Sequence, residues 1–286
     1  PFSARELARS TGRPPFITEF FPSALDNDAK DDVETSARSA RRVEDRAALL
    51  GGMPSVCLEE TRDPVLWFRG FEQTYLERDL RDLAHVADLG TFRRLMRLAA
   101  LRTGQVLNQS DLGRDAKLNA VTTGRYLNLL ETSFVIDRLP AYLGNRASRL
   151  IKAPKLYVTD SGLAAHLTGA ADDDGRMLDP LMGALVETWT AQNLRSILGA
   201  HWPRARLHYW NIQGGHEVDF VIEAGRHVLA IEVKSHARWR AADLAGLEAF
   251  LRFTPHCRAA ILAHRGESVA RVGERLWALP LGLVLA

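Results

Sequence analysis

The sequence predicts a mixed fold in two parts: an α+β winged helix-turn-helix, followed by an α/β domain with a mixed sheet. Apolar residues recur at helical spacing between residues 89 and 131, and two short strand patterns follow them. Beyond residue 176, short apolar strands alternate with helical segments, as in α/β domains. An aspartate-rich stretch at 171–175 lies between these two patterns and is the best candidate for a boundary.

Three helices are predicted in the first part. The first carries apolar residues at i, i+3, i+4 and i+7, and the second spans about 108–114. Asn119 caps the third, which runs to about Glu131. The third helix is expected to turn Val121 inward with two leucines and to leave four polar residues facing out: Thr122, Thr123, Arg125 and Asn128.

A basic hairpin is predicted after these helices. Strand patterns at 134–139 and 155–159 flank a Gly-Asn turn region with three basic residues, Arg146, Arg149 and Lys152. Helix, helix, helix and basic hairpin is the order of a winged helix. Its third helix would enter a DNA major groove and its wing would contact phosphate. The alternative is a winged helix used only for packing or protein contact, because the outward face of the third helix holds one arginine.

Composition narrows the class of protein but does not identify a partner. The 286 residues carry a formal net charge of +2, which is too small to indicate nucleic acid. The two cysteines, Cys57 and Cys257, form no CxxC, so a disulfide framework or zinc site is not expected. Neither a signal peptide nor an apolar run of membrane length is apparent, and we expect a cytoplasmic protein without membrane contact.

The second part shows the pattern of an α/β domain. One helix face is predicted at 182–189 and a second helix at 241–253. Strands are predicted at 207–210, 218–223, 228–233 and 259–263, with an edge strand at 282–285.

Three charged residues interrupt the two central strands. Side chains alternate along a strand, so Glu232 and Lys234 share a face. If Glu223 pairs with Val228 across the connecting loop, Asp219 lies opposite Glu232. A loop two residues shorter would place Asp219 diagonal to Glu232. Either register brings together three residues that we call the charged trio: Asp219, Glu232 and Lys234.

The charged trio suggests metal-dependent chemistry. Two neighbouring carboxylates repel unless a cation lies between them, and Mg²⁺ takes such oxygen ligands. Asp219 and Glu232 are therefore the candidate metal ligands, and Lys234 would orient water or stabilise charge on a phosphate. Glu187, on the preceding helix, would supply a further carboxylate. The alternative is a structural salt-bridge cluster at a sheet edge.

The spacing of these residues resembles the PD-(D/E)xK nuclease superfamily. Several stretches are also similar to a prokaryotic family of AAA-type P-loop ATPases whose C-terminal part is called domain of unknown function 4143. The similar stretches are Gly51–Val56, Thr74–Leu83, Leu127–Glu131, Ile151–Leu167, Leu181–Trp189, Tyr209–Glu223 and Val228–Lys234. The resemblance implies a winged helix followed by a restriction-endonuclease-like mixed-sheet domain. It matches Glu187, Asp219, Glu232 and Lys234 to the nuclease-like motif.

One departure from this family bears on function. Full-length relatives begin with an ATPase core that contains G-x-x-x-x-G-K-[ST], and no such string occurs here. We therefore expect no ATP site and no ATPase activity from this chain. The resemblance then divides it into a helical remnant of the ATPase lid region at 1–88, a winged helix at 89–170 and a nuclease-like domain at 176–286.

Three functional hypotheses follow. The first is a DNA-associated module in which the nuclease-like domain hydrolyses phosphodiesters with Mg²⁺. The second is a non-catalytic interaction or regulatory protein with protein partners, in which the charged trio is structural. The third is an ATPase subunit that lacks its own core. The sequence indicates no oligomeric state.

Overall fold

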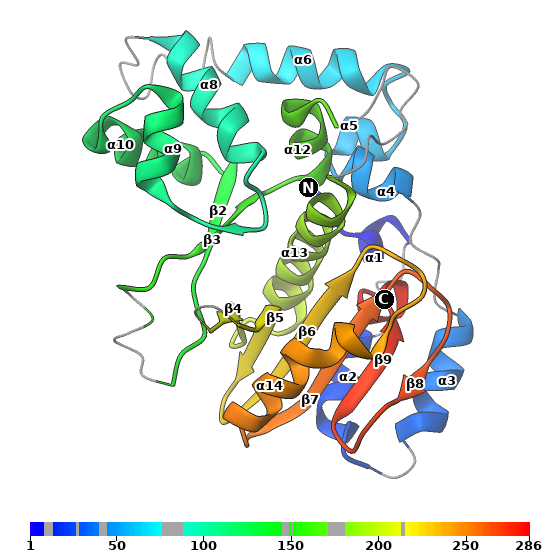
Figure 1. Cartoon of the computed structure of the whole chain (residues 1–286). Coiled ribbons are helices and arrows are strands. Elements are labelled where there is room, and N and C mark those ends of the chain that lie inside the picture. Colours follow the sequence, from blue (N-terminus) through cyan, green and yellow to red (C-terminus); the bar gives the residue numbers. More distant parts are fainter. Residues whose placement is uncertain are drawn as a thin grey trace. The chain divides into compact units, whose positions relative to one another are not determined.

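The computed structural model describes residues 1–8, 14–26, 29–39, 45–75, 88–144, 149, 151–170, 181–212 and 215–286. Contacts between elements divide the chain into two compact units (Figure 1). The first contains Asp45–Leu139 and Ala153–Trp189. The second contains Phe2–Glu44, Pro140–Lys152 and Thr190–Ala286. These units do not separate residues 1–88 from 89–170, and the predicted domain boundaries stay a prediction.

The first unit is mainly helical. In this unit the predicted Asn119 cap is confirmed, since its side chain accepts the Thr122 backbone N–H, and Asn108 caps the preceding helix in the same way. Its helices are α4 (Asp45–Leu50), α5 (Pro54–Cys57), α6 (Pro64–Thr74), α8 (Leu89–Ala100), α9 (Gln109–Ala116), α10 (Ala120–Thr132), α12 (Ser161–Thr168) and the start of α13 (Met182–His201). The apolar face predicted for the first of the three helices is confirmed, because Phe92, Leu95, Met96 and Ala99 are all buried in α8.

A small antiparallel sheet completes the first unit. Its order is β1-β3-β2, from β1 (Gln105–Val106), β3 (Lys155–Val158) and β2 (Ile136–Leu139). The two longer strands lie where the sequence predicts them. The strand β1 was missed because two residues are too few to show an alternating pattern.

The inward face of α10 differs from the predicted one. Val121 was expected inside and is 82% exposed, whereas Thr123 was expected outside and is completely buried. Gly113 of α9 explains the difference, because a Cβ there would meet the Thr123 hydroxyl. The two helices thus approach closely at this pair, and Thr123, Tyr126, Leu127 and Leu130 form the buried stripe.

The second unit is built on a six-stranded mixed sheet of order β4-β5-β6-β7-β9-β8. The first three strands form an antiparallel meander, β6, β7 and β9 are parallel, and β8 is an antiparallel edge. The bounds are β4 (Arg206–Asn211), β5 (Glu217–Ala224), β6 (His227–Lys234), β7 (Cys257–His264), β8 (Ala270–Arg271) and β9 (Leu276–Pro280). The strand predicted at 282–285 is wrong: the last strand is β9, and α15 (Leu281–Val284) follows it.

Helices cover both faces of this sheet. The helix α14 (Ala245–Phe253) and the short η2 (Ala241–Leu244) pack on one face, against Val228 and Ala230 of β6 (Figure 1). On the opposite face, Trp277 of β9 meets Phe20 edge to face at 5.5 Å. The remaining helices of the unit are α1 (Ala4–Leu7), α2 (Phe16–Ser23) and α3 (Ala29–Ser39). Among the described helices, none is both long enough and apolar enough to cross a membrane.

Candidate active site on the mixed sheet

The register of β5 and β6 is the first of the two that the sequence allows. Glu223 pairs with Val228 across a tight turn, and the pairing continues to Phe220 and Ile231. Asp219 is the next residue of β5 beyond that last pair. The prediction that a hairpin joins these strands is therefore confirmed.

Glu232 and Lys234 lie on the face of the sheet that α14 covers. Val228 and Ala230 of the same strand are buried against α14 there, and alternation continues this face to Glu232 and Lys234. Lys234 Nζ lies 2.9 Å from Glu232 Oε1. Burial opposes the charge of Lys234, but nearby carboxylates outweigh it and raise the pKa of its ammonium above the ordinary value.

Asp219 joins the two strands through its side chain. It is 7% exposed, and its Oδ2 accepts a hydrogen bond from the backbone N–H of Val233 at 2.9 Å. The Asp219 carboxylate is also among the groups that raise the pKa of Lys234. The structure thus brings the charged trio together at one end of the β5–β6 hairpin.

Asp243 and His236, which sequence reasoning missed, extend this site. Asp243, on η2, contributes to the raised pKa of Lys234. Its Oδ2 accepts a hydrogen bond from Arg240 N at 2.8 Å and lies 3.3 Å from His236 Nε2. These bonds and the charge of Lys234 outweigh burial and hold the pKa of Asp243 low. Asp243 lies in the first turn of η2, where acidic residues are enriched, and this was the available signal.

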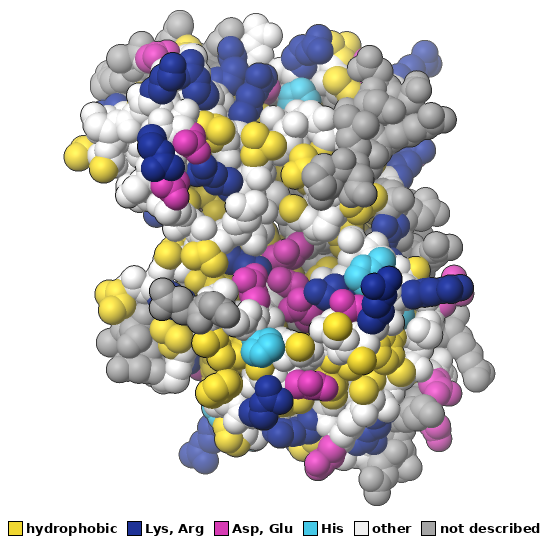
Figure 2. All heavy atoms as spheres, in the orientation of Figure 1, with side chains coloured by type: hydrophobic (Ala, Val, Ile, Leu, Met, Phe, Trp, Pro, Cys, Tyr) yellow, Lys and Arg dark blue, Asp and Glu magenta, His cyan; other side chains and the backbone are white. Residues whose placement is uncertain are grey.

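Charged groups of both signs gather where β6 ends. Figure 2 shows acidic, basic and histidine side chains over the carboxyl end of β6 and the loop that follows it. The strands β6, β7 and β9 are parallel, and Lys234 pairs with His264 at their carboxyl ends. In α/β sheets, ligands commonly bind at this end of parallel strands.

His264 is buried and neutral, and its role is structural. Its Nδ1 accepts a hydrogen bond from Gly266 N at 3.0 Å, so its Nε2 carries the proton and donates to Ser268 O at 3.1 Å. Burial lowers the pKa of the imidazole. His264 therefore holds the turn after β7 beside Lys234.

Glu187 lies in the first unit, next to a buried lysine and a buried tyrosine. Its Oε1 accepts hydrogen bonds from Lys155 Nζ at 2.9 Å and from Tyr157 Oη at 2.5 Å. Lys155 is only 1% exposed, and this pair compensates a buried ammonium. That Glu187 assists the charged trio stays a prediction.

Two of the stretches that carry the family resemblance meet at Asp160. This completely buried carboxylate accepts N–H bonds from Gly52 at 2.7 Å and from Leu163 at 2.8 Å. Gly51 adopts φ +67°, and a Cβ there would overlap the Asp160 carboxylate. The glycine pair and the aspartate are thus explained by packing within the first unit.

Comparison with protein families gives two matches, side by side along the chain. Residues 182–284 match the model of a domain of unknown function (DUF4143). Residues 42–174 match the model of another domain of unknown function (DUF8612). The predicted DUF4143 region is thereby confirmed and holds the whole charged trio, whereas the AAA-type ATPase relationship and the nuclease-like domain stay predictions.

Two mycobacterial proteins are similar to this chain. Uncharacterized proteins of Mycobacterium bovis and of Mycobacterium tuberculosis are each 30% identical to it over 207 residues. The match covers 71% of this chain and 46% of each relative. The chain therefore spans about half the length of the curated relatives it matches.

Within the DUF8612 region, α10 presents part of the predicted DNA-binding face. Arg125 is exposed and lies over the ring of Tyr126 at 5.4 Å. Asn128 is exposed, and its Oδ1 accepts a hydrogen bond from Arg138 at 3.0 Å. Thr122 is half-buried, and Thr123, which is fully buried, is not available to DNA.

The described part of the predicted wing is associated with the second unit. Arg149 makes two bonds to the Glu223 carboxylate, at 2.7 and 3.2 Å, and lies over the ring of Tyr142 at 4.6 Å. Lys152 Nζ donates to Asn211 O at 2.8 Å. Both side chains therefore already have partners within the second unit. Arg146 lies outside the described residues.

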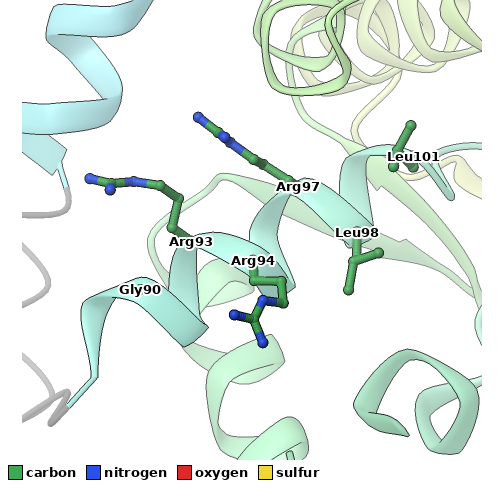
Figure 3. A pocket seen from close by; sticks show the side chains of 6 residues that line it. All are labelled: Gly90, Arg93, Arg94, Arg97, Leu98 and Leu101. Atoms are coloured by element: carbon green, nitrogen blue, oxygen red, sulfur yellow. The ribbon is translucent and has the colours of Figure 1, made fainter. Parts of the chain in front are cut away.

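A hollow of about 320 Å³ lies along α8 in the DUF8612 region. Figure 3 shows that Arg93 and Arg97 point to one side of the helix and Arg94 to another. Arg93 and Arg97 both pair with Glu72, at 3.2 and 3.3 Å. The hollow is lined by Gly90, Arg93, Arg94, Arg97, Leu98 and Leu101. Because its arginines diverge and two are paired, we assign it no ligand.

Proposed function

We propose that the second unit hydrolyses the phosphodiester backbone of DNA with a divalent cation, at the charged trio. The observation that carries the proposal is the β5–β6 register. Asp219 follows the last pair, Phe220 with Ile231, on the strand next to the one that carries Glu232 and Lys234. The same order, Asp on one strand and Glu-x-Lys on the next, underlies the resemblance to the PD-(D/E)xK superfamily.

The donor set fits a hard divalent cation. Asp219 and Glu232 provide carboxylate oxygens from adjacent strands. The ammonium of Lys234 lies beside them, at 2.9 Å from Glu232. Across the described residues, no cluster of three or more His, Cys, Asp or Glu is placed to hold a metal. Two carboxylates agree with the usual way proteins bind Mg²⁺, which keeps several waters and takes further ligands from substrate phosphates.

The chemistry of the step assigns a task to each side chain. A water oxygen bonds to phosphorus, one P–O ester bond breaks, and the leaving oxygen takes a proton. A bound divalent cation would offset phosphate charge and lower the pKa of a ligated water. Lys234 would orient the attacking water or hold the charge that develops on the phosphate oxygens. Burial opposes the charge of Lys234, but the carboxylates around it raise the pKa of its ammonium, which favours a side chain that donates to water or phosphate.

A DNA-associated role also has support in the first unit. The order α8, α9, α10, β2, β3 is the order expected of a winged helix. The α10 helix leaves Arg125 and Asn128 exposed, which are residue types that contact phosphates and bases. We propose that this unit contributes to DNA binding.

One observation favours a second candidate, a non-catalytic interaction protein. Asp219 is engaged by Val233, and Lys234 by Glu232, so the charged trio is already hydrogen-bonded without a ligand. Such a cluster would serve to close the end of the hairpin. In that case the second unit is a scaffold, and its partner is a protein.

A cleavage assay separates the two candidates. Wild type and Lys234→Ala are incubated with single- and double-stranded DNA in Mg²⁺ or Mn²⁺, with EDTA as the metal-free control. We expect wild type to cleave and Lys234→Ala to lose about 100-fold or more in rate, as when one charge-stabilising donor is removed. Arg226→Ala, an exposed change at the opposite end of β6, is the matched control and should cleave normally.

The outcomes discriminate sharply. Equal cleavage by wild type and Lys234→Ala would mean that another enzyme, not the charged trio, is responsible. No cleavage by folded wild type in either metal would remove the proposed enzyme and leave the scaffold candidate.

A further inference from the structure

The loop that leaves the charged trio carries exposed cations on either side of a half-buried tryptophan. We call residues Ser235–Arg240 the basic loop; it runs from the end of β6 to η2. Trp239 is half-buried and packs against the core cluster of the second unit, so it anchors the loop. Arg238 and Arg240, on either side of it, are exposed. The loop therefore packs part of its indole on the core and leaves both arginines exposed.

Neighbouring segments hold this loop in one conformation. Arg265 donates from its backbone N to His236 O at 3.2 Å and from Nη1 to Ser235 O at 3.3 Å. Gly266 lies against Ala237 O so closely that a Cβ would overlap the carbonyl. At the far end, Arg240 N donates to Asp243. The two arginine side chains thus project from an ordered backbone, which reduces the entropy lost on binding.

The charge around the trio explains why such cations are needed. Three carboxylates, those of Asp219, Glu232 and Asp243, surround a single ammonium, that of Lys234, and raise its pKa. A phosphodiester that approaches three carboxylates is repelled unless cations nearby offset them. No ion pair to the guanidiniums of Arg238 or Arg240 occurs within the residues that the structure describes. Arginine suits this task because its planar fork binds two phosphate oxygens at once.

We propose that Arg238 and Arg240 bind the phosphates of a nucleic-acid backbone and guide it to the charged trio. The choice of a phosphodiester as ligand rests on the proposed function. The placement of the two arginines on a fixed loop beside the trio is independent of it. Each guanidinium takes one phosphate, and Trp239 keeps the loop seated on the core.

The test is equilibrium binding without catalysis. Fluorescence anisotropy in EDTA measures the affinity for duplex DNA, single-stranded DNA and single-stranded RNA over a series of salt concentrations. The double variant Arg238→Ala/Arg240→Ala is compared with wild type and with Arg226→Ala/Arg252→Ala. The control pair is also exposed and removes the same charge elsewhere in the second unit.

We expect the Arg238/Arg240 variant to bind about tenfold more weakly at 0.1 M salt. Its slope of log K against log salt should fall by about 1.8 on duplex DNA and about 1.4 on a single strand. The control variant removes the same two charges, so any loss of affinity or of slope that it shows measures the effect of net charge alone. We expect that loss to be smaller than in the Arg238/Arg240 variant. Thermal unfolding should be unaltered in both variants, since all four side chains are exposed.

Failure of this inference is distinguishable from failure of the proposed function. Equal losses in both double variants, or no binding of any nucleic acid by wild type, would overturn the inference. Loss confined to the Arg238/Arg240 variant supports it whether or not wild type cleaves. The three nucleic acids in parallel identify which backbone the loop accepts.

Discussion

The Asp219 carboxylate lies 2.9 Å from the backbone nitrogen of Val233 and bonds to its N–H across the β5–β6 hairpin. One side chain therefore does two things. It closes the strand pairing beyond Phe220 and Ile231, and it acts electrostatically on Lys234. The hydrogen bond to Val233 needs only an acceptor oxygen at residue 219. Binding of a metal ion would need the negative charge of the carboxylate.

Substitution at Asp219 should separate these two roles. Asp219→Asn keeps an acceptor for Val233 N–H and should lower the free energy of unfolding by less than about 1 kcal/mol, whereas Asp219→Ala should cost about 1–3 kcal/mol. Both should weaken Mn²⁺ binding about tenfold or more, because the charge of the ligands sets affinity. Urea unfolding and titration calorimetry are the measurements, with Glu274→Gln, an exposed carboxylate change, as control. Mn²⁺ affinity unchanged in Asp219→Asn would exclude this carboxylate as a ligand.

The sequence could predict features that depend on local rules. Asn119 identifies the start of α10 because a capping side chain bonds to a backbone N–H only three residues on. An even number of residues in the loop between Glu223 and Val228 places the charged trio on one face, because strand side chains alternate. These signals need no knowledge of distant partners.

Features that depend on distant partners could not be predicted. The inward turn of Thr123 follows from the absence of a side chain at Gly113 on another helix. Arg149 resembles a DNA contact in the sequence, yet its partner Glu223 lies 74 residues away. The apolar run at 281–284 suits a strand as well as a buried helix, and only the packing after β9 decides between them.

Substitution of Asp160 should destabilise the first unit more than substitution of Asp63, another aspartate cap there. Its buried carboxylate accepts hydrogen bonds from Gly52 N and Leu163 N. Asp160→Ala therefore leaves two buried backbone donors without this acceptor. We expect a loss of about 3 kcal/mol in the free energy of unfolding, from the cap and a buried unpaired N–H together. Asp63→Ala removes an exposed cap of α6 and should cost only about 1 kcal/mol. Chemical denaturation of both variants makes the comparison, and equal losses would show that the Gly52 contact contributes nothing.

His264 should make the second unit sensitive to mild acid. Burial lowers its pKa below the unfolded value of about 6.5, so the unfolded chain binds the proton more readily. Its stabilising effect is complete above that value and is lost as pH falls toward the folded pKa, when Nδ1 can no longer accept from Gly266. His264→Asn keeps an acceptor and cannot titrate, so its unfolding midpoint should fall less than that of wild type between pH 7 and 5. Thermal unfolding across this range, with exposed His227→Asn as control, is the measurement. If the unfolding midpoints of wild type and His264→Asn fell equally between pH 7 and 5, His264 would not be the source of the acid sensitivity.

The exposed face of α10 offers the sharpest test of DNA binding by the first unit. Arg125 is its exposed cation, beside exposed Asn128, while Val121 adds an apolar contact at the helix start. If α10 lies in a groove, Arg125→Ala should weaken duplex binding and lower the salt slope by about 0.9, the value for one phosphate. Arg114→Ala on α9 is the matched control, because Arg114 is exposed but already pairs with Asp111 at 2.8 Å. Fluorescence anisotropy with duplex and single-stranded DNA, in the same EDTA buffer used for the basic loop, measures both the affinity and its salt slope. A slope unchanged by Arg125→Ala, with wild-type binding intact, would assign DNA contact to the second unit and leave α10 for packing or protein contact.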